Sequence, residues 1–171
     1  PSPRGPRTIG YLARLTPDKG LHILVDAYLD LRRDPKMADV RLLLAGWLGR
    51  EHQAYAKQQF ERLDQAGLSS AYRYLGEVNR QQKREFLRQI DILSVPTTYR
   101  DPKGLFVLEA LAAGVPVVQP AHGAFPELLE STGGGRLCRP NDPHHLAAEL
   151  RFLLSDQQHC RELGEAGRAG V

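Results

Sequence analysis

Short apolar runs alternate with helical patterns along this chain of 171 residues. Each run is apolar at nearly every position, which is typical of strands that are covered on both faces of a parallel sheet. The runs that predict strands are residues 9–13, 40–45, 72–75, 91–95, 115–118 and 136–138.

The segments between these runs have the spacing of helices. Apolar stripes along one helical face run through residues 21–31 and 146–154, and more polar helices are predicted near residues 52–65 and 80–89. Strands and helices that alternate in this way, with right-handed crossovers, predict an α/β fold. We expect a doubly wound, Rossmann-like parallel sheet of about six strands with helices on both faces.

The composition fits one globular domain. Apolar residues make up 42% and charged residues 25% of the chain, which excludes collagen-like, coiled-coil and low-complexity classes. The prolines in residues 1–7 predict a linker, so residues 8–171 form the expected domain. The helical pattern near residue 171 ends without a cap, which indicates a piece of a longer protein.

Charge and cysteine content exclude several partners and compartments. The 23 basic and 20 acidic residues give a net charge of +3, which is too small an excess to indicate nucleic-acid binding. Only two cysteines are present, and this favours a reducing cytoplasm over a disulfide framework. No apolar run approaches the roughly 20 residues that span a membrane.

Three common enzyme motifs are missing. The chain has no G-x-G-x-x-G after its first predicted strand, no P-loop and no G-x-S-x-G, which disfavours dehydrogenases, NTPases and serine hydrolases. The histidines show no metal-ligand spacing. Any catalytic or ligand-binding chemistry must therefore come from residues outside these motifs.

Two cations follow the first predicted strand. Arg14 and Lys19 lie in the loop after it, and ligands of such sheets bind outside the carboxyl ends of the strands. An arginine can bind a phosphate through two hydrogen bonds, and a lysine supplies a point charge. Taken alone, the pattern also fits two solvated loop cations.

A second segment joins an acid to an apolar helix. Asp101 precedes Gly104, where a helix is predicted to begin and to run until Gly114. A glycine there lets a ligand approach the backbone, and the amides of the first helical turn favour an anion. Glu109, about 7 Å along the helix axis, either accepts two ribose hydroxyls or simply faces water. Asp101 is placed to meet hydroxyls on the other side of the phosphates.

These residues resemble the C-terminal, nucleotide-sugar-binding domain of retaining glycosyltransferases of the GT-B fold, in the group 1 or family 4 set. One motif of that family is matched by Gly10, Arg14, Leu15, Lys19 and Gly20. Another is matched by Asp101 and Glu109, which are eight residues apart, and by residues 108–118. The resemblance covers about residues 8–165. Asp101 stands where the family usually has Glu, and Lys103 where an aromatic residue is usual.

The resemblance implies transfer of a sugar from a nucleotide-diphosphate donor to an acceptor, with retention at the anomeric carbon. Arg14 and Lys19 would hold the diphosphate, Glu109 the ribose and Asp101 the hydroxyls of the donor sugar, with Arg14, Lys19 and Asp101 as catalytic residues. Further donor-binding positions would be Gly10, Gly76, Pro96, Thr97, Lys103, Gly104 and Leu105. Because the cations can replace a divalent metal, we expect no metal ligand and no cofactor besides the donor itself.

The same resemblance implies a missing partner. Family members carry an N-terminal acceptor domain that is absent here, so this fragment alone is expected to be inactive. We expect a cytoplasmic protein that binds no nucleic acid, with any contact to the inner face of the membrane made through the absent half. Trp47 is expected to be partly exposed, as a lid or an interdomain contact.

Two other hypotheses stay open. One is a non-catalytic module of the same fold that binds a nucleotide-sugar or a protein, which the departures at Asp101 and Lys103 would permit. The other is an unrelated doubly wound protein such as a flavodoxin-like carrier or a receiver domain. A receiver would have acids at the end of its first strand, where this chain has Arg14 and Lys19. The nucleotide of the donor, whether UDP, GDP or ADP, is left open, as are the sugar and the acceptor.

Overall fold

Six parallel strands form the centre of the molecule in a computed structural model that describes residues 5–171. They are β1 (Thr8–Leu12), β2 (Arg41–Ala45), β3 (Tyr72–Tyr74), β4 (Ile92–Leu93), β5 (Val117–Pro120) and β6 (Gly135–Cys138). The order across the sheet is β3-β2-β1-β4-β5-β6, and every neighbouring pair is parallel. The predicted doubly wound α/β fold is confirmed.

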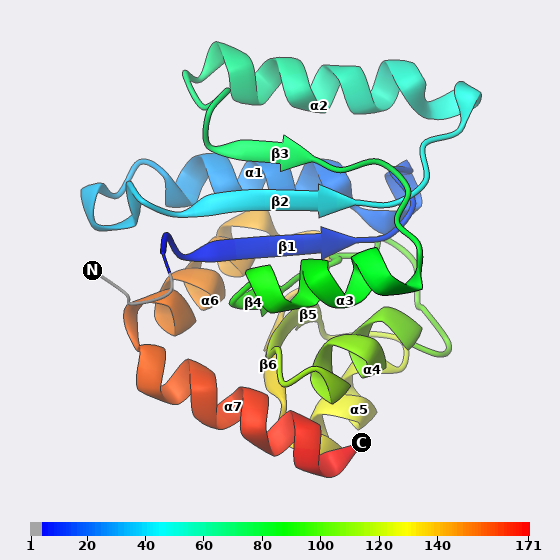
Figure 1. The fold of residues 1–171 in the computed structure, drawn as a ribbon, viewed down its shortest axis with the longest axis vertical. Helices are drawn as coiled ribbons and strands as arrows, with labels where there is room; N and C mark the ends of the chain where they lie inside the picture. Colours follow the sequence, from blue (N-terminus) through cyan, green and yellow to red (C-terminus); the bar gives the residue numbers. More distant parts are fainter. Residues whose placement is uncertain (1–4) are drawn as a thin grey trace.

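Helices cover both faces of this sheet (Figure 1). They are α1 (Leu21–Leu31), α2 (Gln53–Gln65), α3 (Arg80–Gln89), α4 (Leu105–Ala112), α5 (Phe125–Thr132), α6 (Pro143–Ser155) and α7 (Gln157–Gly170). Figure 1 shows α3 in front of the sheet and α1 behind it. Helix α1 packs against α6, and α7 packs against α4 and α5.

The strand order reverses between β1 and β4, and in open α/β sheets such a reversal defines a crevice outside the carboxyl ends of the two strands. The chain runs from β1 outward through β2 to β3, and it then returns across the sheet to β4 on the other side of β1. With right-handed crossovers, the helices that follow β1 and β4, which are α1 and α4, therefore lie on opposite faces of the sheet. This switch point at the carboxyl ends is where open α/β sheets bind ligands.

The β4 ladder is shorter than the predicted run of residues 91–95 because a side chain replaces part of it. Gln119 of β5 is buried, and its Oε1 accepts the amide of Val95 at 2.8 Å. Its Nε2 donates to the carbonyl of Val95 at 2.9 Å. The two strands can therefore separate near the crevice without leaving buried backbone groups unpaired.

Two features differ from the sequence expectations. Helix α5 was not predicted, because its eight residues carry a proline in the first turn and follow directly on a loop motif. Arg7, the last residue of the predicted linker, is already held by the domain. Its guanidinium pairs with Asp39 and donates to the carbonyl of Leu154 at 3.0 Å. Residues 1–4 of that linker lie outside the described residues.

Gly20 offers a test of how closely the crevice loops approach. It has a φ of +75°, and a Cβ atom there would lie 1.9 Å from the carbonyl oxygen of Pro96. Gly67 has a similar φ of +77°, but a Cβ atom there would meet no other atom within 4 Å. We expect Gly67→Ala to lower the free energy of unfolding by about 1 kcal/mol through backbone strain alone. Gly20→Ala should cost about 3 kcal/mol or more, because a backbone carbonyl must also move.

Urea denaturation followed by circular dichroism measures both costs. Equal costs for the two variants would contradict the close approach of Gly20 and Pro96.

Candidate functional site

The loop after β1 presents Arg14 and Lys19 differently. Its path is fixed by Tyr11, whose hydroxyl donates to the carbonyl of Arg14 at 2.7 Å, and by the amide of Leu15, which donates to the carbonyl of Trp47 at 3.0 Å. The side chain of Arg14 is exposed, whereas that of Lys19 retains only 12% of its accessible surface. Trp47 is 45% exposed, which confirms the expected partial exposure. Lys19 is therefore the cation that the crevice encloses.

The loop after β4 lies directly against the loop that carries Lys19. The amide of Thr98 donates to the carbonyl of Asp18 at 2.9 Å, and the carbonyl of Pro96 sits over Gly20. This contact turns the following residues, Tyr99 and Asp101, toward Lys19.

Lys19 is enclosed by polar and aromatic groups. Its Nζ lies 2.5 Å from the hydroxyl oxygen of Tyr99 and 3.4 Å from Oδ2 of Asp101. The same nitrogen is 5.0 Å from the ring centre of Tyr99 and 5.5 Å from that of Phe106, within the range of cation–π attraction. The ammonium is thus stabilised by one anion, one hydroxyl and two ring faces.

Asp101 is 7% exposed and uses both of its carboxylate oxygens. Oδ1 accepts the amides of Lys103 at 3.0 Å and Gly104 at 2.7 Å, and Oδ2 accepts the hydroxyl of Tyr99 at 2.9 Å as well as Lys19. Burial alone would raise the pKa of Asp101. The two amides, the hydroxyl and the ammonium outweigh burial and hold that pKa below its ordinary value, so the group is ionised at neutral pH.

This arrangement differs from the role expected of Asp101. The sequence placed its carboxylate toward the hydroxyls of a donor sugar, but the structure turns it back onto the entrance of α4. The reason is local, because an aspartate side chain readily hydrogen-bonds the amides two and three positions further along the chain. In the structure Asp101 closes the turn that leads into α4 and is the counter-ion of Lys19.

Glu109 lies on α4, and 43% of its side chain is exposed. Its Oε1 lies 2.9 Å from Nζ of Lys83, which comes from α3. The carboxylate is therefore accessible and held in place, and its second oxygen is open to a ligand hydroxyl. Sequence reasoning missed both Lys83 and Tyr99, because neither follows a local motif and each acts through a contact between distant segments.

Packing explains two of the glycines assigned to donor binding. Gly10 lies inside β1, where a Cβ atom would be 2.5 Å from Cδ1 of Ile90. Gly104 begins α4 with a φ of +60°, and a Cβ atom there would be 2.8 Å from Cδ1 of Leu128. Ile90, directly after α3, and Leu128 of α5 therefore leave no room for a side chain at these two positions. Gly76 has open space around it, at the carboxyl end of β3.

The other predicted donor-binding residues gather around the start of α4. Pro96 and Thr97 are buried in the loop after β4, and the hydroxyl of Thr97 donates to the carbonyl of Tyr99 at 3.0 Å. Lys103 and Leu105 are exposed on either side of Gly104. The amide of Leu105 belongs to the first turn of α4, where no intrahelical acceptor exists.

A third loop, after β5, closes against Asp101. The amide of Ala124 donates to the carbonyl of Asp101 at 2.8 Å, and a Cβ atom on Gly123 would lie 2.5 Å from that oxygen. A ring nitrogen of His122, Nε2, lies 3.0 Å from the carbonyl of Thr97. The crevice is therefore built from the loops after β1, β4 and β5.

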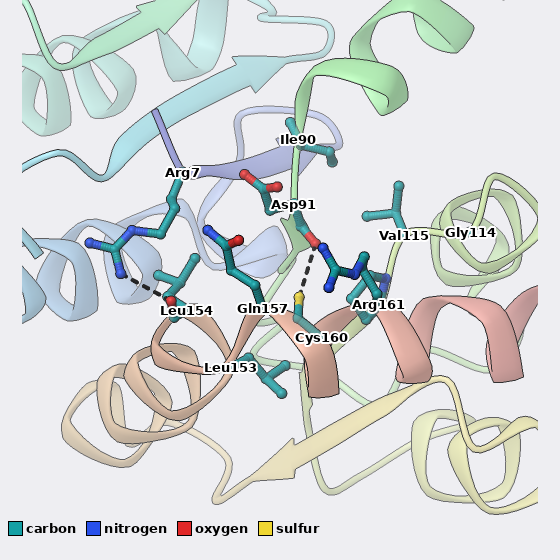
Figure 2. Close-up of a pocket in the computed structure, with 11 residues that line it drawn as sticks. Arg7, Ile90, Asp91, Gly114, Val115, Leu153, Leu154, Gln157, Cys160 and Arg161 are labelled. Carbon is teal, nitrogen blue, oxygen red and sulfur yellow. Dashed lines mark hydrogen bonds between the residues drawn. The ribbon is translucent and has the colours of Figure 1, made fainter. Parts of the chain in front are cut away.

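A separate cavity of about 170 Å³ lies at the amino ends of the strands, on the far side of the sheet from Lys19 (Figure 2). Arg7, Asp91 and Arg161 line it together with Cys160, whose thiol donates to the carbonyl of Asp91 at 3.6 Å. Burial raises the pKa of Cys160 to about 12, so the thiol stays protonated at neutral pH. This cavity takes no part in the crevice.

Across residues 5–171, no group of three or more His, Cys, Asp or Glu side chains is placed to hold a metal ion. Within the same residues, no helix combines the length and the apolar character that crossing a bilayer requires.

The chain matches the family model of glycosyl transferases group 1 over residues 1–170. It belongs to the group 1 glycosyl transferases. Among relatives of this family, it is 31% identical over 167 residues to a glycogen synthase of Mycobacterium tuberculosis, covering 96% of this chain and 38% of that protein. It is 32% identical over 158 residues to a phosphatidyl-myo-inositol mannosyltransferase of Mycolicibacterium smegmatis, covering 91% and 38%. The chain thus spans about two-fifths of the length of these relatives.

Solved structures agree with the family assignment. Anabaena Alr3699/HepE, solved in complex with UDP and glucose, has a TM-score of 0.86 and 27% identity, over 96% of this chain and 43% of that one. The C-terminal domain of LpcC, a group 1 family protein from Francisella tularensis, has the same fold, with a TM-score of 0.87 and 23% identity over 96% of this chain and 84% of that one.

The buried position of Asp101 predicts a pH-dependent contribution to stability. Asp101→Ala removes the acceptor of two amides and leaves Lys19 without its anion, so we expect the free energy of unfolding to fall by about 2–3 kcal/mol at pH 7. Because the pKa of Asp101 is lowered in the folded state, this stabilisation is complete above the unfolded carboxyl pKa of about 4 and is lost as the pH falls through the lower folded value.

Urea denaturation of both proteins at several pH values tests this. The difference between wild type and variant should shrink as the pH falls below about 4. A difference that stays constant down to pH 2 would contradict an ionised Asp101 that accepts hydrogen bonds from the folded protein.

Proposed function

We propose that this chain is the donor-binding domain of a retaining glycosyltransferase that transfers a sugar from a nucleotide-diphosphate sugar to an acceptor. The observation that carries the proposal is the position of Lys19, which is enclosed at the β1/β4 switch point beside the first turn of α4. A cation and helix amides at this place suit the two negatively charged phosphates of a nucleotide diphosphate.

In this proposal Arg14 and Lys19 hold the diphosphate from the loop after β1. As the bond between sugar and phosphate breaks, negative charge grows on the departing diphosphate. Fixed cations and amides that face this charge stabilise the transition state more than the ground state. The same two side chains would perform the charge neutralisation that other glycosyltransferases obtain from a divalent metal.

Glu109 is the proposed ribose ligand. Its carboxylate lies on α4, one helical turn beyond the entrance, and an ionised carboxylate can accept hydrogen bonds from ribose hydroxyls but cannot donate them. Lys83 holds Oε1 at 2.9 Å and so fixes the orientation of the second oxygen. Two adjacent hydroxyls of a ribose could bind there while the phosphates extend toward Lys19.

The relatives support a nucleotide-sugar as the donor. Anabaena Alr3699/HepE was solved with UDP and with UDP-glucose, which makes UDP the first nucleotide to test here. The relatives are more than twice as long as this chain, so the acceptor site is assigned to an N-terminal domain outside it. We place the protein in the cytoplasm, with any membrane contact made by that other half.

A second candidate function is a non-catalytic module that binds a nucleotide-sugar or a protein. The observation that favours it is the complete use of the Asp101 oxygens by protein donors, since a catalytic acid at this position would need to reach the donor sugar. Transfer or hydrolysis of the donor by the longer protein separates the two functions.

Calorimetric titration of the chain with UDP, GDP and ADP tests the proposed site. One nucleotide should bind, and its base is then identified. In Arg14→Ala/Lys19→Ala, two charge-assisted contacts worth about 1.5–3 kcal/mol each are lost, so the affinity should fall by about 100-fold or more.

The matched control is Arg33→Ala/Lys36→Ala. It removes two exposed cations between α1 and β2, at the amino ends of the strands and so away from the proposed site. Its affinity should equal that of wild type. An Arg14→Ala/Lys19→Ala variant that is folded by circular dichroism and binds as tightly as wild type would contradict the proposed site.

A further inference from the structure

We propose that Asp101 is the internal counter-ion of Lys19, that Tyr99 is the positioning residue between them, and that the diphosphate of the donor takes the place of Asp101 as the partner of Lys19. We call Lys19, Tyr99 and Asp101 the lysine latch. This inference rests on the proposed function, because it assigns a specific exchange of partners to the proposed diphosphate site.

The latch closes the site in the structure. Lys19 and Asp101 side chains are 12% and 9% exposed, so neither is available to a ligand in its present position. Nζ donates to the hydroxyl of Tyr99, which in turn donates to Oδ2 of Asp101 at 2.9 Å. Tyr99 therefore bridges the two charges and sets where each one lies.

The latch is built so that Lys19 can leave. The direct contact between Nζ and Oδ2 is 3.4 Å, which is longer than the roughly 2.7–2.9 Å of a strong charge-assisted hydrogen bond. If Lys19 moves to a phosphate, Asp101 still accepts the amides of Lys103 and Gly104 and the hydroxyl of Tyr99. Its buried charge keeps three donors, so the exchange need not disrupt the loop.

The direction of the exchange follows from charge. A diphosphate offers Lys19 a doubly negative partner, whereas Asp101 offers one carboxylate that is already shared among three other donors. The same carboxylate, fixed beside the cation, repels an incoming phosphate. Asp101 should therefore weaken nucleotide binding, the opposite of what a ligand of the donor sugar would do.

Asp101→Asn tests this directly, with UDP as the probe so that contacts to a sugar do not enter. Asparagine forms the same side-chain turn as aspartate, so its oxygen can keep the amides of Lys103 and Gly104 while the charge is removed. We expect Asp101→Asn to bind UDP about tenfold more tightly than wild type in calorimetry. The control is Asp156→Asn, at the cap of α7, where the side chain accepts the amide of His159 at 3.0 Å. Its affinity should be unchanged.

Tyr99→Phe tests the positioning role, because it keeps the ring and removes the hydroxyl. Without the bridge, Lys19 pairs directly with Asp101 and is harder to displace, so UDP should bind about threefold more weakly. The same substitution in the Asp101→Asn background should leave the affinity for UDP unchanged. A structural role for the hydroxyl would give the same loss in both backgrounds.

A second readout needs no nucleotide. Lys19→Met, Asp101→Asn and the double variant are compared in urea, and the two substitutions should be clearly non-additive in the unfolding midpoint. Additive effects, or an Asp101→Asn variant that binds UDP no better than wild type, would overturn the latch. Equal affinity of wild type and Lys19→Met for UDP would instead overturn the proposed function, and with it the exchange of partners.

Discussion

A buried carboxylate that accepts four donors holds the crevice together. Asp101 closes the turn before α4, binds the hydroxyl of Tyr99 and neutralises Lys19, so it ties the loop after β4 to the loop after β1. A charge this deeply buried is tolerated only when its partners are in place. The positions of the lysine, the tyrosine and the first turn of α4 all follow from that requirement.

The sheet topology makes this cluster possible. Strands β1 and β4 are neighbours although they are far apart in the chain, and Gly20 lets the two loops touch because it leaves room for the carbonyl of Pro96. The side chain of Gln119 satisfies the backbone where β4 and β5 separate. The fold thus brings a cation, helix amides and the carboxylate of Glu109 to the carboxyl ends of the strands, which is an arrangement suited to a nucleotide diphosphate.

The sequence predicted the architecture and the chemical character of the site, whereas the detailed pairing of the site residues depends on tertiary contacts. Apolar runs identified the six strands, and Arg14 and Lys19 were placed after the first one, as the structure has them. Pairings between distant segments, such as Lys83 with Glu109, leave no local signal. The orientation of Asp101 was missed for a different reason: its side chain can reach outward or return to the amides just after it, and only the packed loops decide between them.

A crystal structure of this chain soaked with UDP would show whether a diphosphate replaces Asp101 as the partner of Lys19. We expect density for the diphosphate at the carboxyl ends of β1 and β4, within hydrogen-bond distance of Nζ of Lys19 and of the first amides of α4. Lys19 should have moved away from Asp101, which keeps its bonds to Lys103, Gly104 and Tyr99. A diphosphate bound elsewhere, or bound while Lys19 remains against Asp101, would contradict this exchange of partners.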